Sequence, residues 1–156
     1  MWSLTELITQ LQGGLMAETL KEMLIRHEGN EQYPYTDSVG KLTIGVGRNL
    51  TDRGLSVQER MYLLHNDIEL AIEEVRKWIG DNKYYSLCDA RKMVLCDMMF
   101  NLGWTKMQGF KKLHAAVLEG DYDKAADEMK DSRWYQQTGH RAWELCQVMK
   151  KGVLIY

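Results

Sequence analysis

Residues 28–47 read EGNEQYPYTDSVGKLTIGVG, and this stretch decides how the chain folds. Its Asp-Ser-Val-Gly tetrapeptide at 37–40 has the residue types of a tight turn, and strand-like segments at 33–36 and 41–46 flank it. We therefore predict a β-hairpin. In the second segment Leu, Ile and Val alternate with other residues, so Thr43 faces the side opposite to the apolar one. The alternation does not say whether that side meets a binding site or solvent.

The remainder of the chain has the apolar spacing of helices. Ser56 and Glu59 form a capping-box sequence ahead of the longest periodic segment, 57–79. Other helices are expected at about 2–12, 15–28, 86–103, 109–118, 121–129 and 139–151. The segment 86–103 is apolar nearly all round, which predicts a central, buried helix. The fold class predicted is α+β, mainly helical, with one small hairpin inserted early.

The composition is that of a globular domain and indicates no bulk binding partner. The 156 residues are 45% hydrophobic and 27% charged, which is typical of a folded chain. The net charge of −2 gives no basis for general binding to nucleic acid or to an anionic membrane. We expect neither a signal peptide nor a membrane span.

Cysteine and histidine usage predicts neither a disulfide framework nor a metal site. The three cysteines, Cys88, Cys96 and Cys146, are an odd set without Cys-x-x-Cys spacing, so free thiols in a reducing compartment are expected. The four histidines show no paired ligand spacing with Cys or carboxylates. No metal and no other cofactor is therefore expected.

Glu28 and Asp37 are candidate catalytic carboxylates because their local environments differ. Glu28 lies at a predicted helix end, where the negative end of the helix dipole favours the protonated acid. Asp37 lies in a polar turn and is expected to stay ionised. A glycosidase needs such a pair, one carboxyl to donate a proton and one to stabilise a cation or activate water. The plain alternative is a solvated Glu at a helix end and an Asp that only makes the turn, and spacing alone leaves it open.

Three blocks of sequence carry a family resemblance. They are EG at 28–29 with YxDxxGxxTIGxG at 35–47, FNLG at 100–103 with GF at 109–110, and DSRWYQQT at 131–138 followed by Arg141. In this order they resemble the phage-type lysozymes of glycoside hydrolase family 24, the T-even phage endolysin group. The match extends over residues from about 20 to 145, which is most of the chain.

The resemblance implies a lysozyme-like two-lobed fold and a muramidase activity. A single lysozyme domain would span 1–156, with an N-terminal helix extension over about 1–20, a small β-hairpin lobe over about 29–56, a connecting helix at about 57–79 and a larger helical lobe over about 80–156. The implied substrate is bacterial peptidoglycan, cut at the β-1,4 bond between N-acetylmuramic acid and N-acetylglucosamine. The family is inverting, whereas the sequence itself leaves the stereochemical course open.

The resemblance also assigns roles to the candidate residues. Glu28 matches the general acid that protonates the leaving glycosidic oxygen, and Asp37 matches the second carboxylate. Thr43 matches a hydroxyl that helps to place the attacking water. Arg141 matches an arginine that pairs with the catalytic Glu and orients it.

Other positions of the resemblance concern binding and structure. Phe100 and Asn101 match the end of the central helix that lines the substrate site, although Phe100 fits a plain core residue nearly as well. Arg48 replaces a His of the T-even pattern, and Asp67 falls at the place of that His's partner, so a structural Arg48–Asp67 pair is expected. The segment between Gly47 and Asp67 is shorter than in the T-even enzyme, which leaves subsite preferences open.

The setting implied is that of a phage or prophage endolysin. Such an enzyme would be a monomer in the host bacterial cytoplasm before lysis, and a separate pore-forming protein would release it to the cell wall. Two alternatives remain: a lytic transglycosylase that uses Glu28 alone, and a wall-binding module without catalysis. Asp37 and Thr43 argue against the first, and the joint presence of Glu28, Asp37, Thr43 and Arg141 argues against the second.

Overall fold

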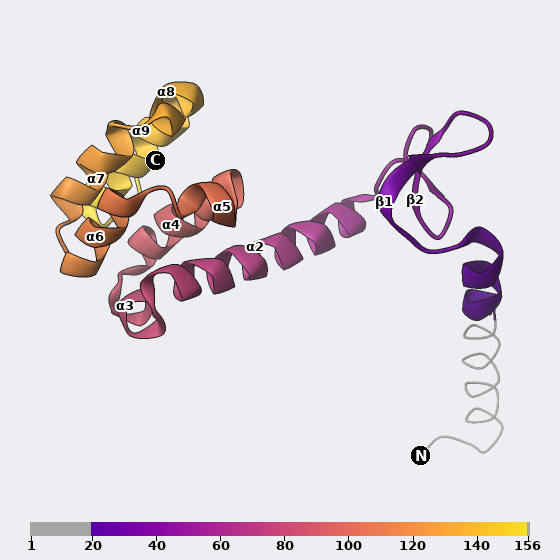
Figure 1. Cartoon of the computed structure of the whole chain (residues 1–156), viewed down its shortest axis with the longest axis horizontal. Helices are drawn as coiled ribbons and strands as arrows, with labels where there is room; N and C mark the ends of the chain where they lie inside the picture. Colours follow the sequence, from indigo (N-terminus) through magenta and orange to yellow (C-terminus); the bar gives the residue numbers. More distant parts are fainter. Residues whose placement is uncertain (1–19, 156) are drawn as a thin grey trace, which may run out of the picture. The chain divides into compact units, whose positions relative to one another are not determined.

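The computed structural model describes residues 20–155 and divides the chain into two compact units, Met1–Arg60 and Met61–Tyr156. The helix expected at 2–12 lies outside the described residues. Figure 1 shows strands in the first unit and helices throughout the second. The predicted fold class, α+β and mainly helical with a small strand unit, is confirmed. The proposed lobe boundaries stay a prediction.

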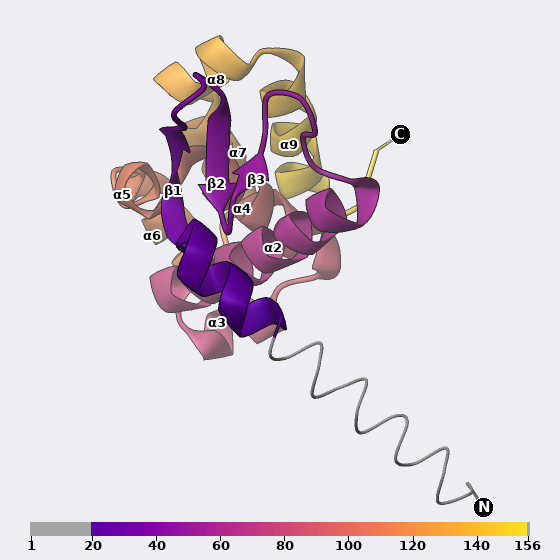
Figure 2. The same cartoon turned by 90° about the vertical axis from the view of Figure 1, so that its right-hand side faces the viewer.

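The first unit is built on a small antiparallel sheet that follows the helical residues 20–28. Its strands are β1 (Glu31–Thr36), β2 (Leu42–Gly45) and β3 (Arg48–Asn49), in the order β1-β2-β3 (Figure 2). The predicted hairpin is thus confirmed as β1 and β2. The third strand was not predicted, because two residues are too short for any alternation to appear.

The side of β2 that carries Thr43 is the packed side. Thr43 is only 4% exposed, whereas Leu42 before it is 46% exposed. Tyr35 on β1 and Asn49 on β3 flank Thr43 directly in the sheet register. Thr43, a polar residue on the middle strand of the sheet, is therefore buried in this unit.

The long helix α2 (Val57–Ile79) has the bounds that its apolar spacing predicts. The predicted capping box is present as well: the Ser56 backbone N–H donates to Glu59 Oε2 at 2.8 Å, and the Glu59 N–H donates to Ser56 Oγ at 3.2 Å. Two backbone N–H groups at the helix start thus gain partners.

The second unit consists of helices that follow one another through short connections. They are α3 (Asp81–Ser86), α4 (Asp89–Leu102), α5 (Trp104–Met107), α6 (Lys111–Glu119), α7 (Tyr122–Lys130), α8 (Arg133–Thr138) and α9 (His140–Lys151). The longer helices correspond to predicted segments, and the short α3, α5 and α8 do not. Ser86 was expected to start α4, but it ends α3, where its hydroxyl donates to the Lys83 carbonyl at 2.7 Å.

The core of the second unit is rich in methionine. Helices α4, α6, α7 and α9 pack on one another around it. Five methionine side chains are almost fully buried there: Met98, Met99, Met107, Met129 and Met149. Helix α4 is central, as predicted, but Met93 and Phe100 on it are about half exposed, so it is not buried all round.

We predict that Leu95→Ala lowers the free energy of unfolding by about 2–5 kcal/mol, because Leu95 on α4 is fully buried and its truncation leaves a cavity. Met93→Ala, two residues earlier on the exposed side of the helix, should change it by no more than about 0.5 kcal/mol. Urea unfolding followed by circular dichroism measures both. Equal losses in the two variants would contradict the assignment of the α4 faces.

A second prediction concerns the three free thiols. Burial raises the pKa of the Cys146 thiol to about 11 and also raises that of Cys96, whereas Cys88 is exposed. Because the thiolate is the reactive form, native protein at pH 8 should react with a thiol reagent rapidly at Cys88 and only slowly elsewhere. Unfolding without reductant should then release all three. A shortfall of two thiols in the unfolded protein would instead indicate a disulfide.

Candidate active site

Asp37 is fixed by the turn that joins β1 to β2. Its Oδ1 accepts hydrogen bonds from the backbone N–H of Val39 at 3.0 Å and of Lys41 at 2.8 Å. Its own N–H donates to the Lys41 carbonyl at 2.9 Å. The two bonds to one carboxylate oxygen fix the side chain in the turn and leave Oδ2 to meet other groups.

The hydroxyl of Thr43 lies next to this carboxylate. Its Oγ1 is 3.4 Å from Asp37 Oδ2 and 3.3 Å from the Lys41 carbonyl oxygen. A hydroxyl has one hydrogen to donate and two lone pairs that accept. Whichever oxygen receives the hydrogen, Thr43 keeps the capacity to accept a bond from a third group, such as a water molecule.

Glu28 is the last of the helical residues 20–28, and its side chain packs against the turn between β2 and β3. The next residue, Gly29, has φ +78° and donates its N–H to the Ile25 carbonyl at 3.0 Å, which is a left-handed helix ending. A Cβ atom placed on Gly47 would lie only 2.9 Å from Glu28 Oε2. Gly47 also has φ +65°. The Glu28 carboxylate therefore occupies the space that the missing side chain of Gly47 leaves free, and we call this position the seat of Glu28.

The three predicted catalytic residues thus belong to one compact unit. The structure brings Thr43 to Asp37 and places Glu28 against the turn that follows β2. The seat on Gly47 was not predicted. Its signal in the sequence was the Gly-x-Gly after the strand segment, since a glycine in a strand often marks a close approach of another group.

The predicted binding and orienting residues belong to the second unit. Arg141 Nε and Nη2 bind Asp97 Oδ1 at 3.1 and 2.9 Å. The expected pairing of Arg141 with Glu28 would join the two units and stays a prediction. Asn101 Oδ1 accepts a hydrogen bond from Trp134 Nε1 at 3.0 Å. Phe100 is 48% exposed, which does not fit a plain core residue.

Arg48 has a partner that was not predicted. It forms an ion pair with Glu59, and its Nη1 donates to the Gly54 carbonyl at 3.3 Å. Glu59 also belongs to the capping box of α2, so one side chain joins β3 to the start of the long helix. The expected pair with Asp67, a residue of the second unit, stays a prediction.

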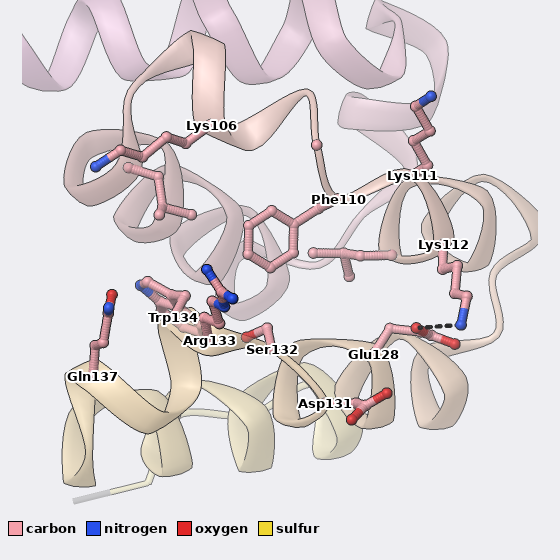
Figure 3. A pocket seen from close by; sticks show the side chains of 13 residues that line it. Lys106, Phe110, Lys111, Lys112, Glu128, Asp131, Ser132, Arg133, Trp134 and Gln137 are labelled. Carbon is pink, nitrogen blue, oxygen red and sulfur yellow. Dashed lines mark ion pairs between the residues drawn. The ribbon is translucent and has the colours of Figure 1, made fainter.

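A pocket of about 870 Å³ opens in the second unit between α5, α6, α7 and α8. Phe110 and Trp134 meet edge to face there, with ring centroids 6.5 Å apart. Figure 3 shows the Phe110 ring between α6 and the side chains of Ser132, Arg133 and Trp134. Trp134 is also held by Asn101, so the predicted Asn101 supports a wall of this pocket.

The rim of this pocket is mainly cationic. Lys106, Lys111, Lys112 and Arg133 lie along it. Glu128 and Asp131 are the acidic lining residues, and Glu128 lies 4.0 Å from Lys112 Nζ. Such a mixture of aromatic faces and cations is suited to a ligand with apolar rings and negative groups. The sequence indicates this cationic lining, because residues 98–118 contain three lysines and no Asp or Glu.

Within residues 20–155, the His, Cys, Asp and Glu side chains form no group of three or more that could hold a metal ion. No helix in the same described range combines the length and apolar character needed to cross a bilayer.

Comparison with known proteins agrees with the geometry. A family model described as "Phage lysozyme" matches residues 25–148. "Probable T4-type lysozyme 2" of Dictyostelium discoideum is 28% identical over 89% of this chain and 98% of its own length, and "Probable T4-type lysozyme 1" of the same organism is 27% identical over the same shares. The "Pre-baseplate central spike protein Gp5" of Enterobacteria phage T4 is 27% identical over 87% of this chain but only 28% of its own length.

The family model and the T4-type lysozyme relatives identify the class of protein as a lysozyme-type glycoside hydrolase that acts on the cell wall. The family match covers most of the chain. The chain therefore belongs to the phage lysozyme family, whose substrate is peptidoglycan.

We predict that Gly47→Ala lowers wall-clearing activity by about a hundredfold, because the new Cβ displaces the Glu28 carboxylate and small misplacements of a catalytic group cost about that much. Gly54→Ala is the matched control. Gly54 has nearly the same backbone angle, φ +61°, but an added Cβ there meets nothing within 4 Å. Turbidity loss of a wall suspension measures activity, and thermal unfolding checks that both variants are folded. A fully active Gly47→Ala protein would contradict the assigned seat.

Proposed function

We propose that this protein is a muramidase that hydrolyses the β-1,4 bond between N-acetylmuramic acid and N-acetylglucosamine in peptidoglycan. The observation that carries the proposal is the contact between the Asp37 carboxylate and the Thr43 hydroxyl, on the same small unit as Glu28. A carboxylate and a hydroxyl side by side can hold a water molecule, which a hydrolase needs.

Glu28 acts as the general acid. It donates its proton to the glycosidic oxygen as the bond from that oxygen to the sugar's anomeric carbon breaks, and the ring gains oxocarbenium character. The contact with Gly47 supports this role, because it holds the carboxyl group in one place. The proton on the leaving oxygen becomes the new hydroxyl of one product.

Asp37 and Thr43 act on the nucleophile. A water molecule donates one hydrogen bond to Asp37 Oδ2 and one to Thr43 Oγ1, and its oxygen attacks the anomeric carbon. Asp37 takes the proton that the water loses, so a protonated Asp37 and an ionised Glu28 remain, and exchange with solvent restores both. Attack from the face opposite to the leaving group gives the inverting course that the family resemblance implies.

Residues of the helical unit hold the parts of the polymer that do not react. Phe100 offers an exposed ring to a sugar, and Asn101 keeps Trp134 in the wall of the large pocket. Arg141 orients Glu28 once substrate is bound. The support for these roles is the family match together with the pocket's aromatic and cationic lining.

The biological role we propose is lysis of a host bacterium from within. The enzyme would gather as a monomer in the host cytoplasm and reach the wall after a separate pore-forming protein opens the membrane. Support comes from the phage lysozyme family match alone.

The type of product end tests the reaction. Digestion of purified peptidoglycan followed by mass spectrometry should give reducing muramic acid ends, because water is the nucleophile. Anhydro-muramic ends would identify a lytic transglycosylase instead. Binding to the wall without any new ends would identify a module without catalysis.

We predict that Glu28→Gln lowers the rate of wall clearing by at least about a hundredfold, because the amide cannot donate the required proton. The control is Glu22→Gln, an exposed acid in the same helix that faces no assigned group. Circular dichroism should show both variants folded. Clearing by Glu28→Gln at the rate of the parent protein would remove Glu28 as the acid.

A further inference from the structure

A second pocket of the helical unit has no role in the proposed reaction. It has a volume of about 420 Å³ and lies between the end of α2, α5 and the start of α6. The lining residues are Lys77, Trp78, Trp104, Gln108, Lys111 and His114. Its volume falls within the range of about 300–1,000 Å³ that is usual for small-molecule sites.

Two tryptophans give the pocket broad, fixed apolar faces. Trp78 and Trp104 are each half-buried against the core, so part of each indole remains open to the pocket. His114 holds the Trp78 side: its ring centroid is 5.0 Å from that of Trp78, and its Nε2 lies 2.9 Å from the Trp78 carbonyl oxygen. Such rigid indole faces suit the C–H face of a sugar ring, since both are flat and apolar.

The pocket is also cationic. Lys77 Nζ lies 4.8 Å from the centre of the Trp104 ring, and Lys111 of α6, which also lines the large pocket, lines this one as well. Among the described residues, no Asp or Glu lines the pocket. Within the helical unit neither lysine has a carboxylate partner within 4.0 Å, so both charges can serve a ligand. A ligand that is complementary to this pocket would therefore carry at least one negative group.

We infer that this pocket is a second, non-catalytic site for the wall polymer, which takes a sugar ring of the glycan strand on Trp104 and an ionised carboxylate of the attached peptide at Lys77. Gln108 supplies an amide that can donate to sugar hydroxyl oxygens and accept from their hydrogens. The inference rests on the substrate class of the proposed function, but not on Glu28, Asp37 or Thr43. It gives the helical unit a binding site for the polymer that contains none of the proposed catalytic residues.

Binding is tested with the Glu28→Gln protein, which leaves the polymer uncut. Its affinity for purified, insoluble peptidoglycan is measured by co-sedimentation. Lys77→Gln and Trp104→Ala on this background should each weaken binding about fivefold, which corresponds to the loss of about 1 kcal/mol expected for one ion pair or one ring contact. Lys151→Gln, an exposed lysine at the end of α9, should leave binding unchanged.

Chemistry of the ligand is tested in the same assay. Peptidoglycan whose carboxylates have been converted to amides should bind the Glu28→Gln protein more weakly, and the added Lys77→Gln change should have no further effect on that polymer. Vesicles with anionic lipid serve as the other probe. Retention by vesicles but not by peptidoglycan would overturn the inference in favour of a membrane surface.

The result for Lys77→Gln decides between the outcomes, because Lys77 is exposed and its replacement should leave the fold intact. Unchanged binding by this variant and by folded Trp104→Ala would overturn the second site, even if the enzyme cuts peptidoglycan as proposed. Conversely, a wild-type protein that produces no new ends but loses binding on Lys77→Gln would overturn the proposed reaction and support the site.

Discussion

The two hydrogen bonds that Asp37 accepts from the backbone of its own turn are the constraint on which the arrangement of the strand unit depends. They hold the turn closed, and the closed turn sets the register in which Tyr35 stands opposite Thr43. That register brings the Thr43 hydroxyl to the second oxygen of the same carboxylate. The turn that follows β2 then supplies the open position at Gly47 on which Glu28 lies. One side chain therefore acts both as turn former and as chemical group.

The two units differ in the kind of charged group that they present. The strand unit contains the carboxylates and the hydroxyl to which the proposed function assigns bond cleavage. The helical unit contains two pockets lined by cations and aromatic rings, to which the proposals assign binding of the polymer. The hydrogen bonds that support Asp37 and the contact of Glu28 with Gly47 all lie within the strand unit. Substitutions in the pockets of the helical unit should therefore leave these groups in place.

Local patterns in the sequence were enough for the hairpin, the capping box and the bounds of α2. Each of these is decided by residues within four positions of one another, such as Ser56 and Glu59. The short helices α3, α5 and α8 escaped prediction because one or two turns show no period. Packing of the rest of the chain stabilises them, as for Trp134 on α8, which is buried and bound to Asn101 on α4.

Partners that meet only after folding could not be predicted. Arg48 binds Glu59, a partner that no motif indicates, because the turn after β3 returns the chain to the start of α2. The expected pair of Arg48 with Asp67 stays a prediction. The family resemblance did point to Glu28, Asp37 and Thr43. It could not give the support on Gly47, since a glycine's lack of a side chain matters only when the neighbour that fills the space is known.

The methionine-rich core ties the lifetime of the enzyme to oxidants as well as to heat. Buried thioethers at positions such as Met98, Met107 and Met129 are out of reach of peroxide while the helices stay packed. Once the unit opens, oxygen transfer to sulfur makes a polar sulfoxide that no longer fits the interior. Each unfolding event in an oxidising medium can therefore prevent a molecule from refolding. The rate at which activity is lost would then depend on how often the helical unit unfolds.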